Sequence, residues 1–326
     1  MATIKDVANL AGVSVATVSR MMNNRGVVSD KTRRKVMRAM KELSYRPNEM
    51  ARALQTRKSH IVGLLVPAID NPFFCRLISS VEQACCALGY KLMLCRSGYQ
   101  ESREKELVEL LQANKVDGIL LCSYAGDTAG YSRLELPVVS IDRIIEGIPS
   151  VVSDNQKGGM LAAQALYEAG SRRPLLCSGI VASHTELYRR NISFVQECRR
   201  RGMLCANVEV GNDLQEPETV RTLQKAFREA PDIDGVFVNS DLMAAQFLQL
   251  SRGADLKAAR NLPLVGYDGI GVSKLLGIST IVQPIESVGE CAVNLLVQII
   301  DGKSVPEKSL LSVTYVARES TCHIPG

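Results

Sequence analysis

Residues 3–22, TIKDVANLAGVSVATVSRMM, carry the clearest local pattern in the chain. Thr3 and Asp6 have the spacing of a capping box in front of a short apolar helix. Gly12 is expected to end that helix after about two turns, and Ser14 to cap a second helix that runs to Met22. Two short helices joined by a tight turn at glycine predict a helix-turn-helix unit.

A third helix and a linker follow this unit. Ser29 is placed to cap a helix that runs to Ser44, and its apolar residues fall on one face: Val36, Met40 and Leu43. Pro47 stops regular structure, and residues 48–56 form a short linker that is able to become helical. Because helices of this length are marginal in water, we expect the linker to fold with a partner.

Positive charge is concentrated in this part of the chain. The whole sequence has 39 Lys and Arg against 34 Asp and Glu, a net charge of +5. Residues 1–60 hold 13 of the basic and four of the acidic residues, which gives them +9 and leaves −4 for the remainder. A basic module on a mildly acidic body indicates a polyanionic partner for the first part alone, with a solvated charged face as the alternative.

From residue 60 onward, strands alternate with helices. Residues 61–67, IVGLLVP, are a continuous apolar run, as a strand buried on both faces requires. Further apolar strands, separated by helices, follow as far as Gly158. The same alternation begins again after Gly158 and continues to residues 263–268. This alternation predicts parallel sheets in two similar subdomains. Ligands in such folds bind beyond the carboxyl ends of strands, so the expected binding site is the cleft between the subdomains.

Composition argues against several other classes of protein. The ten cysteines are scattered without a Cys-x-x-Cys pair, and the three histidines are isolated from one another. A disulfide scaffold, a zinc ribbon and a histidine metal site are therefore not expected. No apolar run approaches the ~20 residues of a membrane span, and the start lacks the pattern of a secretory signal. We expect a cytoplasmic protein with no cofactor, no metal and no membrane contact.

The segment from Thr3 to Leu54 resembles the headpiece of the LacI/GalR family of bacterial repressors. Similar motifs continue in the body: DNPFF (70–74), VDGILL (116–121), SDN and GG (153–159), VGYD (265–268) and VQP (282–284). The body also resembles periplasmic sugar-binding proteins, especially the ribose type. The implied fold class is an all-α helix-turn-helix headpiece followed by an α/β, periplasmic-binding-protein-like body of two subdomains with parallel sheets.

The resemblance also implies where the parts begin and end. The headpiece would span residues 1–46, the hinge helix and linker 47–60, and the effector-binding and dimerisation domain 61–326. Within that domain, the N-subdomain would comprise about 61–158 and 285–326, and the C-subdomain about 159–284.

On the DNA side, the family's base-reading positions correspond to Val15, Ala16 and Arg20. Arg20 is able to donate two hydrogen bonds to guanine, whereas Val15 and Ala16 can only contact thymine methyl groups. Three polar residues are implicated as phosphate donors: Ser14, Thr17 and Asn23.

The linker resembles the family's hinge helix. There Leu54 would insert into a minor-groove step, with Arg52 near a phosphate, although a lone leucine in a linker is otherwise an ordinary apolar residue. Two headpieces on a twofold dimer would read a pseudo-palindromic operator.

For the effector, the resemblance implicates a set of side chains near strand ends: Asn71, Phe73, Phe74, Asp142, Arg143, Arg190, Ser240, Asp268 and Gln283. Aromatic faces can stack on sugar C–H groups, and carboxylates, guanidinium groups and an amide suit sugar hydroxyls. Structural roles are the alternative: the phenylalanines as core, Asp142 with Arg143 as an ion pair, and Asp241 as a helix cap. Ser240 and Ser193 depart from the ribose-type pattern, and other motifs also resemble sucrose-operon repressors.

The sequence thus predicts a cytoplasmic, homodimeric repressor of a carbohydrate-utilisation operon, released from double-stranded operator DNA by a sugar or sugar phosphate. One alternative is a family member whose DNA binding is enhanced by a co-repressor or by a phosphocarrier protein as co-regulator. Three other classes of protein are also considered. The most distant is an α/β enzyme with a DNA-binding module; the others are a secreted sugar-binding protein and a thiol-sensing repressor built on Cys85 and Cys86. No pattern places a catalytic base beside a nucleophile, and buried inert thiols are the alternative for the cysteine pair.

Overall fold

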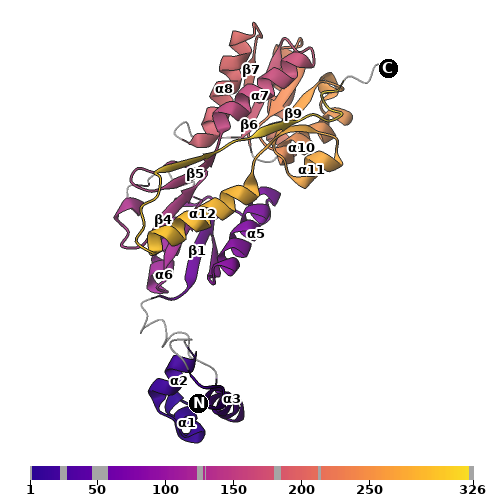
Figure 1. Ribbon diagram of the computed structural model, residues 1–326. Coiled ribbons are helices and arrows are strands. Elements are labelled where there is room, and N and C mark those ends of the chain that lie inside the picture. The colour runs from indigo at the N-terminus through magenta and orange to yellow at the C-terminus, as the bar shows by residue number, and fades with distance from the viewer. Residues whose placement is uncertain are drawn as a thin grey trace. The chain divides into compact units, whose positions relative to one another are not determined.

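The computed structural model describes residues 2–22, 28–45, 58–122, 128, 130–179, 185–211 and 214–322. The chain divides into two compact units, Met1–Ser59 and His60–Gly326, which we call the headpiece and the body (Figure 1). Among the described residues, no helix has both the length and the apolarity needed to cross a membrane.

The headpiece contains three helices: α1 (Ile4–Ala11), α2 (Val15–Met22) and α3 (Asp30–Glu42). Thr3 forms the predicted capping box, because its hydroxyl accepts from the Asp6 amide and the Asp6 carboxylate accepts from the Thr3 amide. Gly12 ends α1 with a left-handed φ of 62°, which favours glycine. Ser29 caps α3 as expected, but that helix ends at Glu42 rather than Ser44.

A small apolar core holds these helices together. Each helix contributes one valine that is fully buried: Val7, Val18 and Val36. Val36 is therefore the centre of the predicted stripe on α3, and Met40 and Leu43 pack against the cluster at its edge. The face of each helix opposite this core remains exposed.

The body contains two six-stranded sheets, each covered by helices. The first sheet has the order β11-β5-β4-β3-β1-β2. Its strands are β1 (Ile61–Val66), β2 (Lys91–Arg96), β3 (Gly118–Leu121), β4 (Val138–Ile141), β5 (Ser150–Ser153) and β11 (Lys308–Leu311). Its helices are α5 (Pro72–Ala87), α6 (Glu101–Ala113) and α12 (Ile285–Ile300), with a single turn η1 (Tyr131–Arg133).

The second sheet repeats this plan with the order β12-β10-β9-β8-β6-β7. Its strands are β6 (Pro174–Gly179), β7 (Ala206–Val210), β8 (Gly235–Val238), β9 (Leu264–Asp268), β10 (Ser279–Val282) and β12 (Thr314–Val316). Its helices are α7 (Asn155–Glu168), α8 (Glu186–Arg200), α9 (Pro217–Glu229), α10 (Asp241–Arg252) and α11 (Gly271–Leu275), with a turn η2 (Lys257–Ala259).

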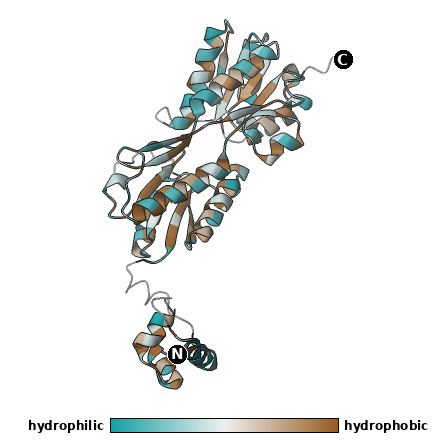
Figure 2. Cartoon of the chain, in the orientation of Figure 1, coloured by the Kyte–Doolittle hydropathy of each residue, from teal (hydrophilic) through white to brown (hydrophobic). Residues whose placement is uncertain are grey.

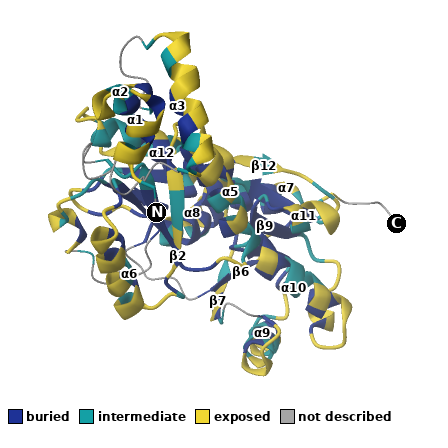
Figure 3. Ribbon diagram, turned by 90° about the horizontal axis from the view of Figure 1, so that it is seen from below, coloured by how far each residue is buried: buried dark blue, intermediate teal, exposed yellow. Residues whose placement is uncertain are grey.

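The predicted parallel, two-subdomain architecture is confirmed. Every strand pair is parallel except β10 with β12. Figure 2 shows the apolar residues running along the strands of both sheets, while α6 and α9 turn mostly exposed faces outward in Figure 3. Four apolar clusters pack against the two sheets and hold the strands in place up to their carboxyl ends.

The subdomain boundaries differ from the expected ones at two places. The segment 285–326 does not lie wholly in the N-subdomain, because its apolar run 310–316 is divided between β11, which pairs with β5 in the first sheet, and β12, which pairs with β10 in the second. Val313 is fully buried in the core of the second sheet, so the chain passes from the first subdomain to the second just before it. Residue 158 also falls inside α7, a helix of the second subdomain that begins at Asn155. The chain thus crosses near residues 154, 284 and 312.

Candidate nucleic-acid interface and effector site

Helix α2 of the headpiece has one buried and one exposed face. Val18 and Met21 pack into the core, whereas Val15, Ala16 and Arg20 are exposed. Because positions four apart share a helix face, Ala16 and Arg20 lie one turn apart on the same side. The three predicted base-reading residues are therefore exposed to solvent, and none of them is part of the headpiece core.

The predicted phosphate donors have local roles as well. The Ser14 hydroxyl accepts from the Thr17 amide at 3.1 Å and lies 2.9 Å from the Thr17 hydroxyl, so this pair caps α2. Thr17 is partly exposed and Ser14 is exposed. Asn23, Arg52 and Leu54 lie outside the described residues.

The exposed face of α3 is strongly basic. Six side chains on it reach solvent: Lys31, Arg33, Arg34, Lys35, Arg38 and Lys41. A helix carrying this many cations in a 13-residue span produces a positive potential that attracts a polyanion at low salt.

In the body, Arg190 on α8 is the centre of a buried polar cluster. It is 1% exposed, its Nε donates to the Asn155 Oδ1 at 2.9 Å, and its Nη1 donates to the Asn239 carbonyl at 2.9 Å. The guanidinium also stacks on the Tyr267 ring, 3.6 Å from the ring centroid, and lies 4.0 Å from the Asp268 Oδ1. A buried cation requires such a set of partners, because desolvation is costly.

Two polar atoms of this cluster are not satisfied by the protein. Among the described residues, Arg190 Nη2 and Gln283 Oε1 are buried without a hydrogen-bond partner. Gln283 Nε2 donates to the Asp268 Oδ1 at 2.8 Å, so Asp268 connects the two residues. Buried polar groups rarely stay unpaired in native proteins. A group that accepts from Arg190 and donates to Gln283 would complete the cluster, as a hydroxyl does.

Two carboxylates with altered proton affinity face this cluster. Burial raises the pKa of Asp142 to about 6, with the Arg190 charge acting in the opposite direction. Burial raises the pKa of Asp268 to about 8, again against Arg190, while the charge of Asp241 adds to the increase. Asp142 follows β4 of the first subdomain and Asp268 ends β9 of the second. The cluster therefore joins both subdomains at the carboxyl ends of their strands.

Asp142 and Asp268 also share an unusual backbone conformation. Their φ angles are 59° and 116°, in the left-handed region that L residues seldom adopt. Backbone strain of this kind gathers at functional sites, where the surrounding structure holds it in place.

Arg143 does not join Asp142 in this cluster. It is 4% exposed, and burial lowers its pKa against the charges of Glu104 and Tyr131. The Tyr131 hydroxyl donates to the Glu104 carboxylate at 2.5 Å. Arg143 thus belongs to a separate buried group in the first subdomain, because the left-handed φ of Asp142 turns the chain just before it.

The remaining predicted effector residues have structural roles in this structure. Asn71 caps α5 by accepting from the Phe73 amide at 2.9 Å, and Ser240 caps α10 by accepting from the Met243 amide at 3.3 Å. Phe74 is 3% exposed and belongs to the core of the first subdomain, while Phe73 is partly buried against it. The two rings meet edge to face, with centroids 5.2 Å apart.

Sequence reasoning missed Asn155 and Tyr267 and misplaced Asp241. Asn155 accepts hydrogen bonds from both Arg190 and Tyr267. Asn155 is the last residue of the SDN motif, and Tyr267 is part of the VGYD motif. Asp241 does not cap its helix; its buried carboxylate accepts from the Ile270 amide and the Thr280 hydroxyl.

The adjacent cysteines Cys85 and Cys86 differ from each other. Cys85 is 1% exposed, and burial raises the pKa of its thiol to about 11, so it is unreactive near neutral pH. Cys86 is exposed, contrary to the expectation that both thiols are buried. Among the described residues, no group of three or more His, Cys, Asp or Glu is placed to hold a metal ion.

Comparison with known proteins agrees with these observations. The family model for bacterial regulatory proteins of the lacI family matches residues 3–48, and the model for periplasmic binding proteins and the sugar-binding domain of the LacI family matches residues 59–319. The chain is 36% identical to the ribose operon repressor of Bacillus subtilis (strain 168), over 98% of this chain and 99% of the relative. It is 36% identical to the sucrose operon repressor of Lactococcus lactis subsp. lactis, over 94% and 95%.

Solved structures show the same fold. The Lac repressor dimer bound to operator and the anti-inducer ONPF has a TM-score of 0.84 at 24% identity, covering 99% of both chains. A periplasmic binding protein/LacI transcriptional regulator from Alkaliphilus metalliredigens QYMF, complexed with D-xylulofuranose, has a TM-score of 0.72 at 28% identity. It covers 81% of this chain and 100% of that one. The relatives are named as repressors and not as enzymes, and the chain belongs to the LacI family of bacterial transcriptional repressors.

Proposed function

We propose that this LacI-family repressor controls a carbohydrate-utilisation operon in the cytoplasm as a homodimer. It binds a pseudo-palindromic operator through α2 and releases it when a sugar or sugar phosphate enters the site around Arg190. The single observation that carries this proposal is the pair of unsatisfied buried atoms, Arg190 Nη2 and Gln283 Oε1. A hydroxyl-rich ligand supplies the missing acceptor and donor together.

The DNA-binding half of the proposal rests on the exposed face of α2. Arg20 gives it a bidentate donor for guanine, and Val15 and Ala16 give it apolar contacts for thymine methyl groups. The basic face of α3 adds attraction to phosphates that is independent of sequence. In the hinge, Leu54 inserts into the minor groove with Arg52 near a phosphate, as the resemblance to the family's hinge helix implies.

Coupling between the two sites follows from the origin of the ligand-facing residues. Asp142 comes from the first subdomain, whereas Arg190, Asp268 and Gln283 come from the second. A ligand that contacts both sets favours the arrangement in which the subdomains are close together. If that arrangement holds the dimer's hinges apart, the ligand lowers DNA affinity by its preference for this state.

The opposite sign is the second candidate. A co-repressor or a phosphocarrier protein would favour the state with high DNA affinity and tighten binding. The same fold serves both directions, so the sign is a measured outcome of the experiment below.

The test is a fluorescence anisotropy titration of the full chain on a labelled pseudo-palindrome from its own promoter region. Binding is measured at several salt concentrations, with ribose, sucrose, xylulose and sugar phosphates added in turn. A steep salt slope with preference for the pseudo-palindrome, and release by one sugar, is expected. A sugar that tightens binding would favour the co-repressor, and specific binding that no sugar changes would favour the protein co-regulator. Absence of specific binding by folded dimer would overturn the proposal.

A further inference from the structure

Two cysteines of the second subdomain lie next to each other across a turn. Cys198 is in the last turn of α8 and is fully buried, whereas Cys205 directly precedes β7 and is partly exposed. Both belong to the same apolar cluster, where the two thiols are near enough to shift each other's pKa, and the Cys205 thiol donates to the Ala206 carbonyl at 3.2 Å. The turn is fixed by the Met203 amide, which donates to the Cys198 carbonyl at 2.9 Å.

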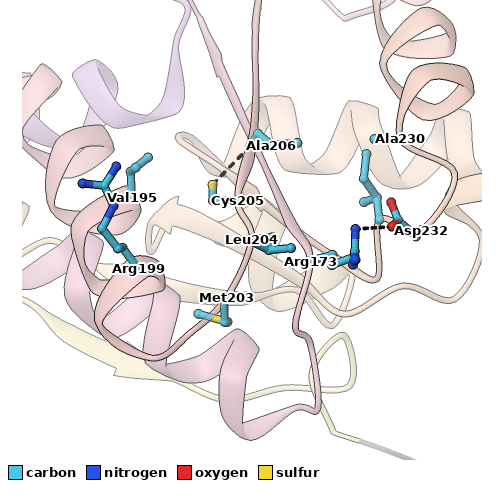
Figure 4. A pocket seen from close by; sticks show the side chains of 10 residues that line it. Arg173, Val195, Arg199, Met203, Leu204, Cys205, Ala206, Ala230 and Asp232 are labelled. Atoms are coloured by element: carbon cyan, nitrogen blue, oxygen red, sulfur yellow. Dashed lines mark hydrogen bonds and ion pairs between the residues drawn. The ribbon is translucent and has the colours of Figure 1, made fainter.

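Only one of these two sulfurs is open to a small reagent. Cys205 lines a pocket of about 360 Å³, which Figure 4 shows from close by, and Cys198 does not line it. Arg199 lines the same pocket, as does Arg173, which pairs with Asp232. A small oxidant in the pocket therefore meets Cys205 first, because Cys198 is fully buried in the apolar cluster.

The two thiols are also tuned in opposite directions. The neighbouring Cys198 thiol lowers the pKa of Cys205 despite its burial, and the Leu176 amide contributes to the same decrease. The Cys205 sulfur, together with burial, raises the pKa of Cys198. The thiolate is the reactive form of cysteine, so Cys205 is favoured as nucleophile and Cys198 remains a protonated neighbour. Elsewhere in the body, burial raises the pKa of Cys177 to about 12.

We propose that Cys205 and Cys198 form a dithiol that a hydroperoxide converts to an intramolecular disulfide. The Cys205 thiolate attacks the peroxide O–O bond, which gives a sulfenic acid on Cys205 and, after proton uptake, one molecule of water when the oxidant is hydrogen peroxide. The Cys198 sulfur then attacks the Cys205 sulfur, the S–S bond forms, and the sulfenic oxygen leaves as a second water carrying the Cys198 proton. Two electrons pass from the two sulfurs to the peroxide.

This dithiol is connected to the candidate effector site through a shared helix. Cys198 lies two turns after Arg190 on the same helix, α8. A disulfide would fasten the end of that helix to the start of β7.

The sequence makes the bridge simple to detect, because trypsin cuts after each of the arginines between the two cysteines. Full-length protein is treated with hydrogen peroxide, remaining thiols are alkylated, and the digest is analysed by mass spectrometry. The expected product joins peptide 191–199 to peptide 202–221, each of which holds one cysteine, with a mass about 2 Da below their sum. Reduction with dithiothreitol should separate the two peptides.

Two variants and one internal control decide the result. Cys198→Ala should abolish the cross-link and leave a sulfenic acid on Cys205 that dimedone traps, and Cys205→Ser should abolish both products. Cys75 is exposed and its thiol donates to the Ile69 carbonyl, so it serves as the control and should oxidise several-fold more slowly than Cys205. Oxidation of Cys205 no faster than of Cys75, or oxidised wild-type protein without the linked peptides, would overturn the proposal.

Discussion

Replacing Gly159 with alanine should disturb the helix pair that holds Arg190. A Cβ atom at Gly159 would lie closer than 3.0 Å to the Arg190 carbonyl oxygen, the Ser193 hydroxyl and the Phe194 amide nitrogen of α8. Two of these three atoms belong to the backbone, so no side-chain rotation relieves the overlap. Helices α7 and α8 must move apart instead, and their contact is the most extensive between any two elements of the described structure.

The expected cost can be estimated from this geometry. Overpacking a close-packed core costs about 1–3 kcal/mol and occasionally more, and a backbone obstacle places this case at the upper end. For a unit of this size, each kcal/mol lowers the melting temperature by roughly 2–4 °C, so we expect Gly159→Ala to lower it by roughly 6–12 °C. The effector affinity should fall as well, because Arg190 moves with α8.

A matched substitution is available at Gly271, the first residue of α11. A Cβ there meets nothing within 4 Å, and its φ lies outside the left-handed region. Gly271→Ala should therefore leave the melting temperature unchanged or raise it slightly. Thermal unfolding of the full chain, followed by circular dichroism, compares the two variants. If both variants melt within about 2 °C of the wild type, the close approach of α7 and α8 does not support the site.

Three further predictions concern the two sites. Arg20→Ala should weaken binding to the specific operator by about 1–3 kcal/mol, or roughly 5- to 150-fold, and leave thermal stability unchanged because the side chain is exposed; equal loss on random DNA would contradict a base-reading role. The raised pKa of Asp268, about 8, means that the folded protein binds a proton that the unfolded chain releases near pH 4. Stability from this group is therefore highest below pH ~4 and falls as the pH rises to about 8, and Asp268→Asn should flatten that part of the wild-type profile in urea unfolding. An unchanged slope in Asp268→Asn would refute the assignment. Leu54→Ala should weaken operator binding and keep sugar binding, whereas parallel loss of both would indicate misfolding.

The headpiece was predictable from sequence because its signals are local. Thr3, Gly12 and Ser29 each fix a helix end through atoms within a few residues, and the structure has those ends. The single apolar stripe on α3 was sufficient to find its buried face. Where the signal weakened, at the end of α3, the helix stopped two residues early at Glu42.

The body was predictable in its architecture and less so in its site. Asp142 and Gln283 follow strands directly, and strand ends meet at one edge of a sheet, so both could be selected from the chain. Arg143 is adjacent to Asp142 yet faces Glu104, because direction after a strand end depends on a left-handed φ that no motif reveals. Asn155 and Tyr267 contact Arg190 from distant parts of the sequence, and contacts of that range have no local pattern.

The run 310–316 shows the same limit. Its apolar letters suit one strand, but the pairing that divides it into β11 and β12 depends on strands more than thirty residues earlier. Composition alone does not report which sheet will accept each half.

The role of Arg190 in effector binding is tested by sugar-dependent release of operator DNA from Arg190→Gln, compared with Arg228→Gln. Arg228 is an exposed arginine on α9, a helix that contributes no residue to the cluster, and serves as the matched control. Anisotropy without sugar should give wild-type operator affinity for both variants, which shows that they are folded. Because charge-assisted hydrogen bonds contribute about 1.5–3 kcal/mol, Arg190→Gln should need roughly 10- to 150-fold more sugar for half release, and Arg228→Gln the wild-type amount. Half release at the same sugar concentration in both variants would contradict the assignment of the effector site to Arg190.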